Sequence, residues 1–152
     1  MKRGIVAAAI ATLAFACGGR DVAPFAAALD ALPLPSTWRI AQTITESQDG
    51  AEGCIEMVNA KCPSVTRYFV VTGGLTDLLM EAKRAAAAGG FTNIEVTHPD
   101  CDVISSGPPC SLVATNDEMR IDIGIYPPGR DVDGLGLATP DQATVRMIAW
   151  PN

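Results

Sequence analysis

The stretch "EMRIDIGIY", residues 118–126, alternates strictly between apolar and polar or small side chains after its first residue. Because successive side chains of a β-strand point to opposite faces of a sheet, this alternation predicts a strand with one buried face and one solvent-exposed face. The residues expected on the buried face are Met119, Ile121, Ile123 and Ile125. Those expected on the solvent-exposed face are Arg120, Asp122, Gly124 and Tyr126. The chain therefore has to supply a second layer that covers one side of a sheet.

Two earlier segments also predict strands. Residues 36–46, "STWRIAQTITE", are expected to place Trp38, Ile40 and Ile44 on one face. Residues 65–71, "VTRYFVV", are rich in β-branched and aromatic side chains and predict a better buried strand.

Shorter strands are predicted on both sides of the alternating stretch, at residues 92–97, 111–116 and 143–150. The last of them is expected to turn Val145, Met147 and Ala149 inward. "NDE" at 116–118 predicts a hairpin turn between the third-last strand and the alternating one.

The clearest helix is predicted over about residues 76–88, with an apolar stripe of Leu78, Leu79, Ala82 and Ala86. Thr76 is the predicted N-cap, and Gly89 is the predicted left-handed stop. Because this helix lies closely between two strands, a right-handed parallel crossover is predicted. The fold class that follows is α+β, with a mixed or mostly antiparallel sheet of five to six strands and one main helix packed on one face.

The N-terminus predicts a signal peptide over residues 1–16. Lys2 and Arg3 precede twelve uncharged, mostly apolar residues, 4–15. A run of that length suits the apolar part of a signal peptide, whereas a membrane-spanning helix needs about 20 apolar residues. The small residues Ala14 and Ala16 flank Phe15 and fit cleavage before Cys17.

The same boundary resembles the lipobox of bacterial lipoprotein precursors, with Leu13 to Ala16 leading into Cys17. The leucine lies four residues before the cysteine instead of three, which departs from the tightest family pattern. The resemblance implies a diacylglycerol thioether on Cys17 and palmitate-type acyl chains that anchor the protein in the cell membrane, at its extracytoplasmic face. An ordinary signal peptidase would cut the same bond, so cleavage without a lipid stays open.

Five cysteines support the lipid, because an odd number leaves one thiol without a partner in an oxidising compartment. Lipidation of Cys17 would consume the odd one. The other four are expected to form two disulfides, which allow three connectivities: Cys54, Cys62, Cys101 and Cys110. We predict local pairing, because Cys54 to Cys62 and Cys101 to Cys110 enclose similar short loops with turn-forming residues.

Residues 17–35 predict a lipidated tether that includes a short helix or an extended segment, and residues 36–152 predict a single domain with two cysteine loops. Pro24 suits the first turn of a helix, with Phe25, Leu29 and Leu32 on one face.

The charge of the mature chain argues against two kinds of partner. Without Lys2 and Arg3 it has nine basic and seventeen acidic residues and no basic cluster. Nucleic acid is therefore not expected to bind, and attraction to anionic lipids is not expected to hold the protein at a membrane. The lipid on Cys17 is the predicted membrane contact.

Motifs for catalysis are sparse. His98 is the only histidine, which excludes sites that need two. His98, Asp100 and Asp102 form either a polar turn or a weak metal site. Asp131 and Asp133 resemble the start of a calcium loop that lacks its later ligands. No cofactor is expected.

Two function classes are compatible with this sequence. The first is a non-catalytic binding or structural module of the cell envelope, for an envelope protein or a small ligand, with Tyr126 or Trp150 as exposed contacts. The second is a small envelope hydrolase or metal-dependent enzyme that uses His98 and dispersed carboxylates. The mature part loosely resembles small lipoproteins of high-GC bacteria in "LPSTW", "CPSVTRYFVV" and "AAAAGGF". That resemblance implies a location in the cell envelope and does not imply an activity.

Overall fold

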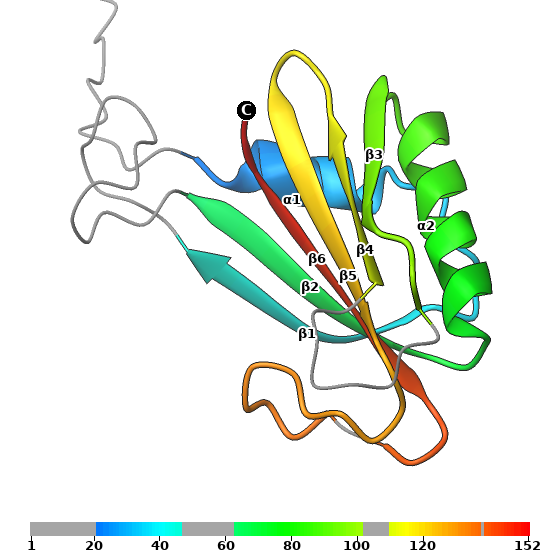
Figure 1. The fold of residues 1–152 in the computed structure, drawn as a ribbon. Coiled ribbons are helices and arrows are strands. Elements are labelled where there is room, and N and C mark those ends of the chain that lie inside the picture. The colour runs from blue at the N-terminus through cyan, green and yellow to red at the C-terminus, as the bar shows by residue number, and fades with distance from the viewer. Residues whose placement is uncertain (1–20, 47–62, 102–109, 138) are drawn as a thin grey trace, which may run out of the picture.

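The computed structural model describes residues 21–46, 63–101, 110–137 and 139–152. Along the chain lie α1 (Ala23–Asp30), β1 (Arg39–Glu46), β2 (Ser64–Val71), α2 (Leu75–Ala88), β3 (Asn93–His98), β4 (Cys110–Thr115), β5 (Met119–Tyr126) and β6 (Ala143–Pro151). The strands form one sheet in the order β1-β2-β6-β5-β4-β3, and each neighbouring pair is antiparallel (Figure 1). The predicted α+β class is confirmed.

The alternating strand β5 lies near the centre of the sheet and supplies its core. Ile121, Ile123 and Ile125 are at most 1% exposed. The neighbouring strand β6 adds Val145 and Met147, both fully buried, as predicted. Both helices lie on this face of the sheet (Figure 1), so one layer of helices closes a single main core.

The short helix predicted near residue 24 is confirmed as α1, with Pro24 in its first turn. Phe25 and Leu29 are buried in the main core, so an extended segment does not describe residues 23–30. Arg67 of β2, itself 8% exposed, donates from Nη1 to Asp30 Oδ1 at 2.6 Å. This ion pair fixes the end of α1 over the sheet.

The predicted cap residues of α2 are wrong by one or two positions. The N-cap is Gly74, whose carbonyl accepts the first helical hydrogen bond from the Leu78 N–H, so Thr76 lies inside the helix. At the other end Gly89 has φ −78°, and Gly90 takes the left-handed conformation at φ +91°. The N–H groups of Gly90 and Phe91 then satisfy the last helical carbonyls, as in a Schellman motif.

The crossover prediction is partly wrong. Helix α2 connects β2 to β3, but β6, β5 and β4 lie between these two strands. Four successive antiparallel pairings make β2 and β3 run in the same direction without being neighbours. The described sheet therefore has no parallel pair, although the connection does cross from one half of the sheet to the other.

The predicted faces of β1 are also wrong. The register shifts between Ile40 and Gln42, and this irregularity reverses which face each later side chain meets. Trp38 joins the main core under the helices, whereas Ile44 contacts a second apolar cluster on the opposite face. Ile40 is 53% exposed. A bulge on an edge strand also discourages pairing with another chain.

Cys101 and Cys110 form a disulfide, which links the segment after β3 to the first residue of β4. This pair is the local one predicted from the sequence, and it excludes every crosswise pairing. Cys54, Cys62 and Cys17 lie outside the described residues. No described helix is long and apolar enough to cross a membrane.

We predict that Cys54 pairs with Cys62, because Cys101 and Cys110 are already joined to each other and Cys17 is the predicted site of lipid attachment. Proteolysis of the alkylated, unreduced protein followed by mass spectrometry should yield two linked peptides, one for each short loop. A peptide that joins either cysteine of the first loop to Cys101 or Cys110 would contradict this connectivity. Reduced protein, digested in parallel, controls for peptides that co-migrate without a covalent link.

Candidate functional site

The helices leave one face of the sheet uncovered, and we call it the open face. The strand registers align one residue from each strand in a row across it: His98, Ser111, Gly124, Arg146, Tyr68 and Gln42. Gly124 stands in the middle of this row and has no side chain. A gap is therefore left between Ser111 on one side and Arg146 on the other.

This gap is an open depression of about 340 Å³, which we call the Gly124 hollow. Its polar lining comes from four strands and consists of Thr97, His98, Ser111, Arg120, Asp122 and Arg146. The volume lies at the lower end of the range for small-molecule sites. A glycine inside a strand often marks a place where another group approaches the backbone closely, which fits its position at the floor.

One wall of the Gly124 hollow depends on a bulge in β3. The register shift between Val96 and His98 brings both Thr97 and His98 opposite Ser111. The hydroxyl groups of Thr97 and Ser111 lie 2.8 Å apart, and His98 Nδ1 lies 3.0 Å from Ser111 Oγ. Three polar side chains are thus connected at one edge of the hollow.

The end of the hollow is closed by an ion pair within β5. Arg120 donates from Nε to Asp122 Oδ1 at 2.7 Å and from Nη2 to Oδ2 at 3.3 Å. The Arg120 guanidinium carbon also lies 5.8 Å from the ring centre of Trp150, its partner across the strands. A bidentate contact and an aromatic surface together hold the guanidinium in a fixed plane.

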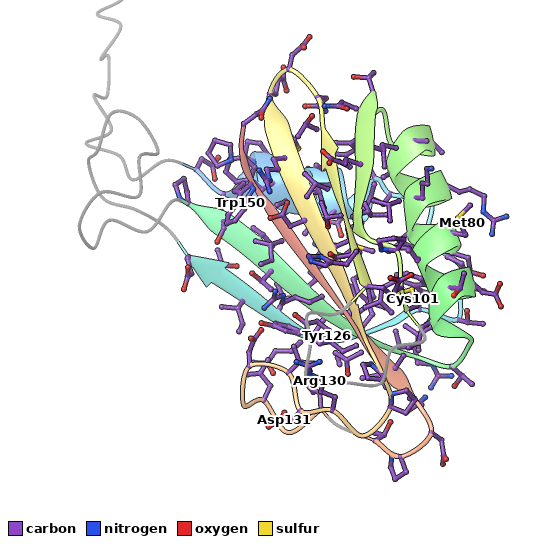
Figure 2. All side chains as sticks on the ribbon, viewed as in Figure 1. Met80, Cys101, Tyr126, Arg130, Asp131 and Trp150 are labelled. Atoms are coloured by element: carbon purple, nitrogen blue, oxygen red, sulfur yellow. A yellow bond between two sulfur atoms is a disulfide. The ribbon has the colours of Figure 1, made fainter. Side chains whose placement is uncertain are left out.

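The opposite end of the open face is covered by the loop at residues 127–137, which follows β5. Val132 of this loop is buried with Tyr68 and Tyr126 in the second apolar cluster. Figure 2 shows Arg130 beside Tyr126, and its guanidinium carbon lies 5.5 Å from the ring centre. The loop therefore belongs to the folded domain and covers that end of the open face.

Asp133 ties this loop to the sheet. It adopts a positive φ of 56°, accepts a 2.8 Å hydrogen bond from Tyr68 Oη and accepts two contacts of 3.0 and 3.2 Å from Arg146 Nη1. Arg146 lies in addition 5.5 Å from the ring centre of Tyr126. The three polar groups come from β2, the loop and β6.

This network shifts the pKa values of Asp133 and Tyr68. Burial opposes ionisation of Asp133, but the hydrogen bonds from Tyr68 and Arg146 outweigh it and lower the pKa of its carboxyl group. Burial, followed by the hydrogen bond to Asp133, raises the pKa of Tyr68 to about 12. The carboxylate and the neutral phenol are therefore the forms that the fold favours.

Several residues expected to act at a site have structural contacts instead. Tyr126 is only 7% exposed, because the 127–137 loop covers it, so the prediction that it is an exposed contact is wrong. Trp150 is half-buried and lies towards the other end of the open face (Figure 2). Asp131 accepts the Gly136 N–H at 2.9 Å, and Asp133 pairs with Arg146. These bonds shape the loop that resembled a calcium site.

His98 lies at the Gly124 hollow, and the described lining there holds one carboxylate, Asp122. Asp102 lies outside the described residues. Over the described ranges no group of three or more His, Cys, Asp or Glu side chains is placed to hold a metal. The grouping of Ser111, Arg120 and Arg146 was not predicted from the sequence, although Gly124 on the polar face of an alternating strand was a signal for it.

No protein-family model, no curated protein sequence and no solved structure matches this chain.

We predict that Asp133→Asn lowers the free energy of unfolding by about 0.5–1 kcal/mol at neutral pH, because a partly exposed ion pair is screened by solvent. The pKa of Asp133 is lowered by folding, so its stabilisation is full above the unfolded pKa, about 3.9, and is lost as the pH falls through the folded value. Urea titrations should therefore show that the free energies of unfolding of the wild type and of Asp133→Asn become equal as the pH falls from neutral to acidic.

Asp131→Asn is the matched control on the same loop, since an asparagine oxygen can still accept the Gly136 N–H. Its stability should differ little from that of the wild type over the same pH range. A constant difference between Asp133→Asn and the wild type down to strongly acidic pH would contradict the assigned role of the carboxylate.

Proposed function

We propose that this protein is a lipid-anchored lipoprotein of the bacterial cell envelope whose folded domain acts by binding, without catalysis. The anchor is Cys17, and the domain lies on the extracytoplasmic side of the membrane. The binding surface is the open face of the sheet, with the Gly124 hollow at its centre.

One observation carries the binding role: the open face presents a hollow whose charged groups are already neutralised and held in place. Arg120 is paired with Asp122, and Arg146 with Asp133. Groups arranged in this way lose little conformational freedom when a ligand binds. A catalytic site instead tends to combine a nucleophile, a base and a third group that orients the base.

A small hydrolase is a second candidate, because His98 Nδ1 lies 3.0 Å from Ser111 Oγ. That distance suits a base and its nucleophile. His98 is exposed, however, and its ring makes one hydrogen bond within the described part of the chain, to Ser111, so no third group orients it. Hydrolysis of a fluorogenic ester that is abolished both by His98→Ala and by Ser111→Ala would favour this candidate over binding.

The anchor is tested by metabolic labelling with a fatty-acid analogue. The wild type should incorporate the label and fractionate with membranes, because the lipid on Cys17 supplies the membrane contact. Cys17→Ser should incorporate none and should be released or left unprocessed. Equal labelling of the two proteins would end the lipoprotein proposal.

The binding surface is tested by placing a photoreactive residue at Val113, on the open face beside Asp122, in cells that carry the protein. Met80 is the matched control, because it is 47% exposed and points outward from α2, on the other side of the sheet (Figure 2). Crosslinks to an envelope component should form from position 113 and not from position 80. Equal crosslinking from both positions would contradict binding through the open face.

A further inference from the structure

We propose that the Gly124 hollow binds an oxyanion, a carboxylate or phosphate group of a small ligand. This inference rests on the proposed binding function and names the chemistry that the open face recognises. It concerns the lining from four strands, β3 to β6, and involves no covalent step.

The first argument is the arginine content of the lining. Two arginines, Arg120 and Arg146, line the hollow together with one carboxylate, Asp122. Each guanidinium is paired with one carboxylate, Arg120 with Asp122 and Arg146 with Asp133, so recognition of an anion depends on directed N–H donors and not on an excess of positive charge. Arginine is the side chain that recognises carboxylate and phosphate groups best, because its planar donors match two oxygens at once.

The second argument is the use of the donors. A guanidinium group has five N–H donors. Asp122 takes contacts from Nε and Nη2 of Arg120, and Asp133 takes contacts from Nη1 of Arg146. The described residues thus leave Nη1 of Arg120, and Nε and Nη2 of Arg146, for a ligand. Each arginine is also held against an aromatic ring, of Trp150 or Tyr126.

The third argument is the opposite wall. The hydroxyl groups of Thr97 and Ser111 and the ring of His98 lie across Gly124 from Arg146, and Arg120 lines the hollow farther along β5. Hydroxyl groups rotate and can donate to an anion without adding charge. A ligand at the floor would therefore meet donors on two sides, and the missing side chain of Gly124 gives its oxygens room near the backbone.

Binding is measured by titrating the isotopically labelled full-length protein with inorganic phosphate and, separately, with succinate, at constant ionic strength. Sodium chloride alone controls for screening of exposed charges. Backbone amide signals of Ser111 and Gly124 should shift and saturate, with a dissociation constant on the order of 1 mM for a single small anion. Saturation by phosphate alone identifies a phosphate-type ligand, and saturation by succinate alone a carboxylate. Saturation by neither overturns the proposal.

Gly124→Val should abolish the saturable shifts, since its side chain would fill the floor, while valine suits a strand. Arg120→Gln should weaken binding about tenfold or more. Arg84→Gln makes the same charge change on α2, on the other side of the sheet, and should leave binding unchanged. The hollow would be overturned as the site if Arg84→Gln lost as much anion affinity as Arg120→Gln. Full anion binding by a folded Gly124→Val protein would overturn it as well. Crosslinking from Val113 that persists when anion binding fails would leave the broader binding proposal standing.

Discussion

Burial of one face of β5 and β6 is the constraint on which the rest of the molecule depends. Ile121, Ile123, Val145 and Met147 are at most 1% exposed. Burying each such side chain is worth roughly 1.5–3 kcal/mol. Because α1 and α2 both use this face, the other face of the same strands stays open (Figure 1). The alternation that builds the core therefore also places Gly124 and Arg146 on the open face.

The strand order explains how distant residues meet on that open face. The last strand, β6, inserts between β2 and β5 and carries Arg146 into the middle of the sheet. Tyr68 of β2 lies beside it, and Asp133 reaches both from the loop after β5. The same arginine thus fastens the loop with one nitrogen and faces the Gly124 hollow. Loop position and site geometry are coupled through Arg146.

Local patterns predicted most elements of this fold, because periodicity and alternation depend only on neighbouring residues. The helix near 76–88, the buried set of β5 and the hairpin at 116–118 follow from such patterns. The two bulges, which redirect Ile44 and His98, depend on register against another strand and have no local signal. The prediction that Tyr126 is an exposed contact was wrong for a related reason. Alternation assigns a side chain to a face of the sheet, but it does not show whether a loop covers that face.

The disulfide relates the fold to the proposed location of the protein outside the cytoplasm. Cys110 directly precedes Ser111, and Cys101 follows closely after His98, so the bond joins the two strands that form one wall of the Gly124 hollow. In the entropic model such a short loop gains about 3 kcal/mol or less from the crosslink, which is modest for the whole domain. Its larger effect is local, because β3 is an edge strand held by one neighbour. On the proposal that the protein works outside the cytoplasm, where disulfides persist, the same oxidising setting that forms this bond also keeps His98 and Thr97 in register with Ser111.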